Sequence, residues 1–100
     1  MELKPGTKLR SDVCDTQVVV VRAPTVDVAL GCGGAPLIAA DAEPAGTLDP
    51  ALADGTLIGK RYADEDLGLE LLCTRGGAGT LTANGVALAV KGAKSVPSSD

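Results

Sequence analysis

The chain has 100 residues, 45% of them hydrophobic; Tyr62 is its one aromatic residue, and the formal net charge is −4. This length fits one small domain or two very small subdomains, and the apolar content argues against global disorder. An acidic chain without a basic run or stacking aromatics is unsuited to nucleic acid. No apolar segment reaches the roughly 18–20 residues that span a bilayer. We therefore expect a cytoplasmic protein that binds neither nucleic acid nor membrane.

The strongest strand signal lies near the N-terminus. A Pro5-Gly6 turn introduces a short alternating segment at 7–10, and residues 17–22 then contain four consecutive valines. Valine is stiff at χ1 and favours extended backbone. A run this apolar predicts a strand that is buried on both faces, or one that contacts another chain. Pro24 ends the strand, and residues 26–30 predict a return strand that completes a β-hairpin.

The composition changes to Ala, Asp, Pro and Gly at residues 39–55, which we interpret as a linker. Within it, Asp49 and Pro50 are typical of a helix start, and Gly55 is typical of a helix end. Their spacing leaves room for one helical turn. No other segment favours a helix, so the sequence predicts an all-β protein.

The second half repeats the pattern of short strands and glycine turns. Strands are predicted at 56–62 and 69–74, with an acidic turn between them. Asn84-Gly85 is a strong two-residue hairpin signal, because both residues tolerate positive φ, and it predicts pairing of 80–82 with 86–90. The tail at residues 91–100 is polar and contains Ser and Pro. The predicted organisation is thus a first module at 1–38, a linker at 39–55, a second module at 56–90 and a mobile tail at 91–100.

Two of the three cysteines bracket the valine strand and its return. The segment from Leu9 to Ile38 holds Ser11 and Cys14 before the strand and Cys32-Gly33-Gly34 after it. This plan resembles the rubredoxin-like module of desulforedoxin and of the N-terminal part of desulfoferrodoxin. In that family a C-x-x-C turn and a Cys-Cys-Gly turn hold one iron tetrahedrally. The resemblance implies that Ser11, Cys14, Cys32 and Gly33 occupy the ligand positions, of which two keep a thiol.

A weaker likeness covers residues 62–90 and suggests an internal repeat. The corresponding positions there are Asp64, Leu67, Ala83 and Asn84, and none is a thiol. The resemblance therefore implies two rubredoxin-like β modules in tandem, packed as a pseudo-repeat, from which most metal ligands have been lost.

The Cys14 and Cys32 pair allows three interpretations: two packed thiols, a zinc or iron site, or a reversible disulfide. The chain contains no histidine, so a four-ligand site needs further donors from Asp12, Asp15, Cys73 or a second chain. Cys73 alternates with Leu69 and Leu71 and is expected to pack in the core.

No constellation in the sequence points to catalysis, because a nucleophilic cysteine has no histidine as its base. The leading hypothesis is a non-enzymatic accessory protein without a cofactor that binds another protein or associates with itself through strand edges. The alternative is a metal-binding or thiol redox protein that uses Cys14 and Cys32.

Overall fold

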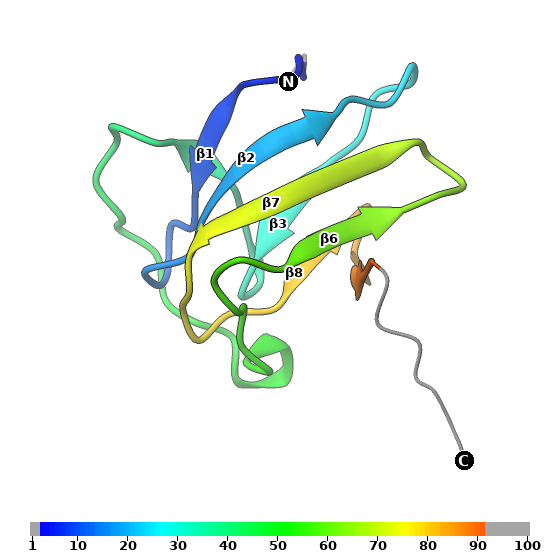
Figure 1. The fold of residues 1–100 in the computed structure, drawn as a ribbon. Helices are drawn as coiled ribbons and strands as arrows, with labels where there is room; N and C mark the ends of the chain where they lie inside the picture. Colours follow the sequence, from blue (N-terminus) through cyan, green and yellow to red (C-terminus); the bar gives the residue numbers. More distant parts are fainter. Residues whose placement is uncertain (1–2, 92–100) are drawn as a thin grey trace.

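The computed structural model describes residues 3–91 and confirms an all-β protein, with a single 3-10 turn as its helical element in that range. The strands are β1 (Lys8–Arg10), β2 (Gln17–Arg22), β3 (Leu30–Cys32), β4 (Ala35–Pro36), β5 (Ile38–Ala39), β6 (Arg61–Asp64), β7 (Leu69–Arg75), β8 (Leu81–Ala83), β9 (Val86–Ala87) and β10 (Ala89–Val90); the 3-10 turn η1 is Pro50–Leu52. Most of the strands are short, and a long connection that contains the 3-10 turn separates β5 from β6 (Figure 1).

The strands form two antiparallel sheets. The larger sheet has the order β10-β6-β7-β2-β1-β5, and the smaller has the order β4-β3-β8-β9. In each sheet a strand of the first half pairs at the centre with a strand of the second half, β2 with β7 and β3 with β8. Outward from that centre the two halves contribute their strands in the same order. The internal repeat stays a prediction.

The core lies between the two sheets. On β2 the buried apolar residues are Val18 and Val20, and on β7 they are Leu69, Leu71 and Cys73, as strand alternation requires. The smaller sheet contributes a second set to the same cluster: Leu30, Cys32, Leu81 and Ala83. The predicted burial of Cys73 is therefore confirmed.

Two local predictions are confirmed. Asn84 (φ 52°) and Gly85 (φ 81°) form the turn that joins β8 to β9, although the predicted partner segment 86–90 is too long, since Ala89–Val90 pairs with β6 in the larger sheet. The helical turn η1 begins after Asp49, whose carboxylate accepts a hydrogen bond from the Ala51 N–H. In both places the local sequence is sufficient, because the side chains or the allowed φ values themselves fix the turn.

The predicted hairpin between residues 17–22 and 26–30 is wrong. The return strand is β3, which begins at Leu30, and it belongs to the smaller sheet, whereas β2 belongs to the larger one. The cause is the loop after Pro24, in which Val26 is 58% exposed and unpaired by any strand. The valine run instead pairs with β1 and β7 on either side.

The predicted strand at 56–62 is also displaced. Thr56 makes only an isolated bridge to Gly77, residues 57–60 form a turn closed by a hydrogen bond from the Lys60 N–H to the Leu57 carbonyl, and β6 begins at Arg61. Gly59 has φ +81°, which explains why this segment turns instead of extending.

The boundaries predicted for the linker and modules stay predictions, and most of the predicted tail lies outside the described residues. Within residues 3–91, no helix has the length and apolarity that crossing a membrane requires.

Candidate functional site

The two cysteines of the first half meet between the sheets. Cys14 lies in the turn that joins β1 to β2, and Cys32 is the last residue of β3. Their Sγ atoms are 3.9 Å apart, and both are free thiols. Cys14 is half-buried, whereas Cys32 has no exposed surface. The folding of β2 and β3 into different sheets thus brings together two thiols that lie 18 positions apart in the sequence.

The turn that presents Cys14 is held by its own polar atoms. Ser11 is fully buried, and its Oγ accepts hydrogen bonds of 3.1 Å from the backbone N–H groups of Val13 and Cys14. From outside, the Arg10 guanidinium donates to the carbonyl oxygens of Ser11 and Cys14. Both ends of this turn are therefore fixed, and so is the position of the Cys14 side chain.

Two polar groups contact the Cys14 sulfur, one two residues along the chain and one from a distant loop. The buried Thr16 hydroxyl lies 3.3 Å from Sγ, and the backbone N–H of Gly79 donates to Sγ at the same distance. A Cβ on Gly79 would lie 2.8 Å from Cys32 Sγ, and one on Gly77 would lie 3.0 Å from Cys14 Sγ. Glycine is needed at these positions so that the loop after β7 can approach the thiols.

These contacts separate the pKa values of the two thiols. Partial burial opposes ionisation of Cys14, but hydrogen bonds from Ser11, Thr16 and the Gly79 N–H together outweigh it and lower the pKa of Cys14 to about 7. Burial and the neighbouring charge of Cys14 raise the pKa of Cys32 to about 11. Near neutral pH the partly exposed Cys14 is therefore partly ionised, whereas the buried Cys32 is a thiol.

The segment predicted to be a linker lies across the site. The Asp12 carbonyl and carboxylate accept hydrogen bonds from the N–H groups of Gly46 and Ala45, and the Gly33 carbonyl accepts one from the Asp49 N–H. A Cβ on Gly33 would lie 2.6 Å from Leu48 Cδ1. This segment thus contacts the two turns that carry the cysteines and helps to bury Cys32.

The further metal ligands considered from the sequence do not join the pair. The Cys73 thiol donates to the Arg75 carbonyl, the Asp12 carboxylate faces Ala45, and Asp15 is exposed. Among residues 3–91 there is no group of three or more Cys, Asp or Glu side chains placed to hold one metal ion. Zinc or iron at Cys14 and Cys32 stays a prediction that requires two further donors.

The second half of the chain has a similar turn at residues 64–67, and this turn contains no cysteine. Asp64 Oδ1 accepts hydrogen bonds from the N–H groups of Asp66 and Leu67, as Ser11 Oγ does in the first half. The Asn84-Gly85 turn matches Gly33-Gly34, which has φ values of 65° and 94°. The acidic cluster at 64–66 is therefore part of a turn.

Sequence reasoning missed three participants in the site: Thr16, Gly79 and the segment around Leu48. Gly79 belongs to a run of closely spaced glycines, Gly76, Gly77 and Gly79. Such a run is a signal of the site, because closely spaced glycines also mark places where a backbone approaches another group closely. Which group it approaches depends on tertiary structure.

Comparisons of the chain with protein-family models, with curated proteins and with solved structures found no match.

Proposed function

We propose that this chain is a small, non-enzymatic thiol redox protein in which Cys14 and Cys32 alternate between a dithiol and a disulfide. The observation that carries the proposal is the 3.9 Å separation of the two Sγ atoms inside a set of fixed hydrogen bonds. A disulfide requires about 2.05 Å, so an approach of roughly 2 Å closes the bond. The protein would serve as an accessory factor whose redox state a partner reads.

The oxidant is an external disulfide, either of a small thiol or of a protein. The Cys14 thiolate attacks one of its sulfur atoms, the external S–S bond breaks, and one thiolate leaves with the electron pair. Cys32 then loses its proton and attacks the Cys14 sulfur, which releases the second external thiolate. The protons lost by Cys14 and Cys32 end on the two released thiols, and the pair has lost two electrons.

The asymmetry of the site suits these two roles. Cys14 is the partly exposed thiol, and a pKa of about 7 leaves about half of it ionised at neutral pH. The pKa of Cys32 is raised chiefly by burial and further by the neighbouring Cys14 charge, which opposes its ionisation. That charge disappears when Cys14 enters a mixed disulfide. Cys32 therefore ionises more easily at the step in which it attacks the Cys14 sulfur.

A zinc or iron site is the second candidate, and one distance favours it. Tetrahedral zinc with Zn–S bonds of about 2.3 Å separates its thiolates by roughly 3.8 Å, close to the observed 3.9 Å. The residues present supply only half of the usual ligand set, because the nearby Ser11 and Thr16 hydroxyls are neutral and already hydrogen-bonded. A complete site would need a partner chain.

We further infer that the site is the remainder of a rubredoxin-like module. The support is the placement of Ser11, Cys14 and Cys32 at two turns that meet, together with the equivalent turns at Asp64 and Asn84. Self-association through strand edges has less support, since the edge strands β4, β5, β9 and β10 are two residues long and offer few unpaired groups.

Thiol counting and intact mass test the proposal. The reduced protein is incubated with oxidised glutathione, then denatured and titrated with a thiol reagent. The three thiols should fall to one, with a mass loss of two hydrogens. The Cys73→Ser control should fall from two thiols to none, and Cys32→Ala should give only a glutathione adduct on Cys14.

Elemental analysis of the freshly purified protein separates the two candidates. Three thiols that persist under oxidising conditions would overturn the redox proposal. So would stoichiometric zinc or iron that is lost in the Cys14→Ser/Cys32→Ser variant, because bound thiolates are not available for exchange.

A further inference from the structure

The outer face of the larger sheet has no covering layer among the described residues. The smaller sheet packs on the opposite face, and β1, β2, β7 and β6 lie in front of it in Figure 1. The uncovered face carries Val19, Val21 and Leu72, which alternate with the core residues and are half-buried. Burial of the valine strand on both faces is thus incorrect within this chain, and the sequence had offered contact with another chain as the other explanation.

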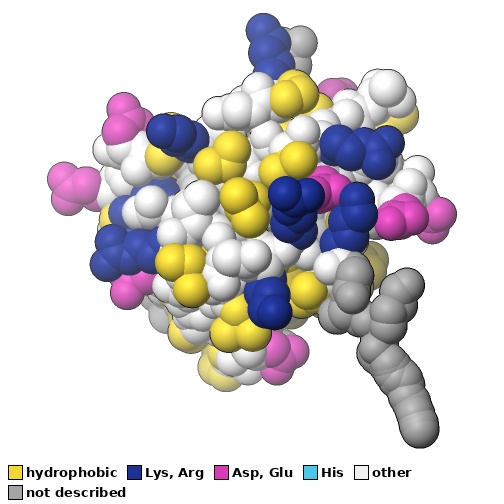
Figure 2. Space-filling view, viewed as in Figure 1, with side chains coloured by type: hydrophobic (Ala, Val, Ile, Leu, Met, Phe, Trp, Pro, Cys, Tyr) yellow, Lys and Arg dark blue, Asp and Glu magenta, His cyan; other side chains and the backbone are white. Residues whose placement is uncertain are grey.

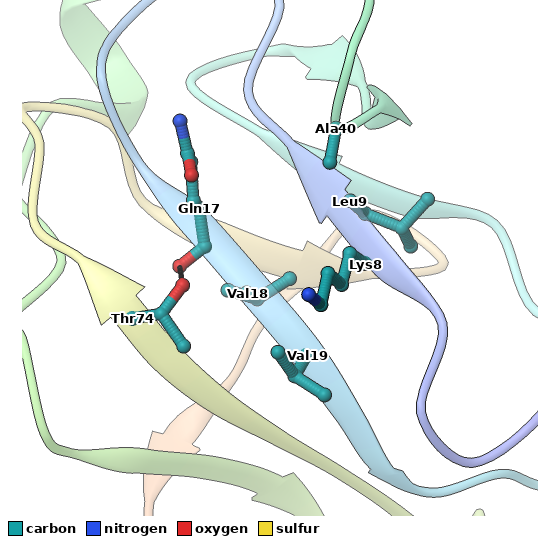
Figure 3. Close-up of a pocket in the computed structure, with 7 residues that line it drawn as sticks. All are labelled: Lys8, Leu9, Gln17, Val18, Val19, Ala40 and Thr74. Carbon is teal, nitrogen blue, oxygen red and sulfur yellow. Dashed lines mark hydrogen bonds between the residues drawn. The ribbon is translucent and has the colours of Figure 1, made fainter.

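We propose that this outer face is the docking surface for an acidic, amphipathic segment of a partner protein. The first argument is shape. A hollow of about 200 Å³ opens on this face between β1, β2 and β7 (Figure 3), lined among others by Lys8, Gln17, Val19 and Thr74. Pockets for whole small ligands span about 300–1,000 Å³. The hollow is therefore better sized for a side chain that protrudes from a peptide.

The second argument is charge. Lys8 and Arg61 flank the apolar centre, and Lys91 lies beside Arg61, so that basic side chains surround apolar ones on the face shown in Figure 2. Glu70 lies among these cations; it is buried and accepts from Arg61 at 3.3 Å and from Lys91 at 2.6 Å. Its two partners remain 57% and 39% exposed.

The sign of this face is opposite to that of the whole chain, which has a net charge of −4. Among residues 3–91 the acidic residues lie in loops and turns, apart from Asp64 and Glu70, and Asp64 is engaged in its own turn. A partner with apolar side chains for the hollow and carboxylates for the surrounding cations is therefore complementary to this face.

Other occupants fit less well. Two copies of the chain that meet through the same face would bring like charges together. Nucleic acid needs stacking platforms, but Tyr62 is the one aromatic residue and it is buried in the core. The proposal does not depend on the redox chemistry of Cys14 and Cys32.

Titration of the full-length, ¹⁵N-labelled chain with synthetic peptides tests the proposal. The first probe is an amphipathic peptide with one leucine face and one glutamate face, and the second has lysine in place of glutamate. The acidic peptide should shift the amide signals of Val19, Leu72 and Thr74. Equal binding of both peptides, or shifts confined to other strands, would overturn the proposal.

Charge reversals sharpen the test at low ionic strength. Lys8→Glu should weaken binding of the acidic peptide about five-fold, and the milder Lys8→Gln should weaken it less. Lys4→Glu is the matched control, because Lys4 is exposed in the turn before β1 and does not line the hollow, and its effect should stay below about two-fold.

Two further measurements identify the competing occupants. Binding of the chain to vesicles that contain phosphatidylserine, combined with no binding of the acidic peptide, would replace the proposal with a lipid surface. A dimer in light scattering that Lys8→Glu dissociates would replace it with a second copy. A monomer that binds the acidic peptide through Val19 and Leu72 supports the proposal.

Discussion

The turn at Ser11–Cys14 and the turn at Asp64–Leu67 have the same backbone construction and different chemistry. In each, the first side chain accepts hydrogen bonds from the N–H groups two and three residues later. The first turn then presents a thiol that meets Cys32, whereas the second presents Leu67. Because the second turn forms without any sulfur, the turn does not require the thiols. The comparison suggests that Cys14 and Cys32 are present for chemistry, and the predictions below test this.

The largest difference is expected between two equivalent glycines. Gly34→Ala should lower the free energy of unfolding by about 3 kcal/mol, because Gly34 has φ +94° and its new Cβ would lie 2.6 Å from Asp49 Cβ. Gly85→Ala, at φ +81° with open space around it, should cost only about 1 kcal/mol. Urea denaturation measures both. Equal losses would contradict the contact between the 39–55 segment and the site.

The second comparison removes the acceptor of each turn. Ser11→Ala should cost about 2 kcal/mol, because two partly buried N–H groups lose a fully buried acceptor. Asp64→Ala should cost about 1 kcal/mol or less, since Asp64 is only half-buried and water can replace its carboxylate. Denaturant midpoints and slopes for the two variants provide the measurement, and a reversed order would mean that the first turn is not closed around Ser11.

The same pair of variants tests the chemistry of Cys14. Ser11 is among the groups whose hydrogen bonds lower the pKa of Cys14. Ser11→Ala should therefore raise that pKa, while Asp64→Ala should leave it unchanged. The pH dependence of iodoacetamide alkylation at Cys14 reports this directly, and an identical shift in both variants would indicate a general loosening of the fold.

A third substitution makes the first half resemble the second. Cys32→Ala gives the end of β3 the same residue type as Ala83, which ends β8. The substitution should lower the free energy of unfolding by only about 1 kcal/mol, because it deletes one buried sulfur. The variant should stay folded and form no intramolecular disulfide. Its amide spectrum and thermal unfolding measure the cost, and complete unfolding would show that the thiol is structural.

The last comparison concerns pH. Cys14 has a pKa of about 7, below its ordinary 9.0, so its contribution to stability is full above pH 9 and is lost as pH falls through 7. The pKa of Cys32 is raised to about 11, so its contribution is full below pH 9 and is lost as pH rises through 11. The stability that the pair supplies should therefore peak near pH 9, and Cys14→Ser/Cys32→Ala should abolish that peak in urea titrations.

The sequence alone determined the all-β class, the valine strand at 17–22, the hairpin at Asn84-Gly85 and the turn after Asp49. Each of these follows from local preferences: β-branched side chains, residues that accept positive φ, or a side chain that caps the turn. The alternation around Cys73 likewise predicted its burial, because side chains of a strand point to opposite faces.

Only the tertiary structure decided which strands pair and what surrounds each thiol. The loop after Pro24 carries β3 into the other sheet, which brings Cys32 to within 3.9 Å of Cys14. Gly79 reaches the same sulfur from 65 positions away, and the 39–55 segment, which the sequence identified only as a linker, covers both turns. Strand pairing and loop packing depend on contacts between distant residues, and local preferences do not encode them.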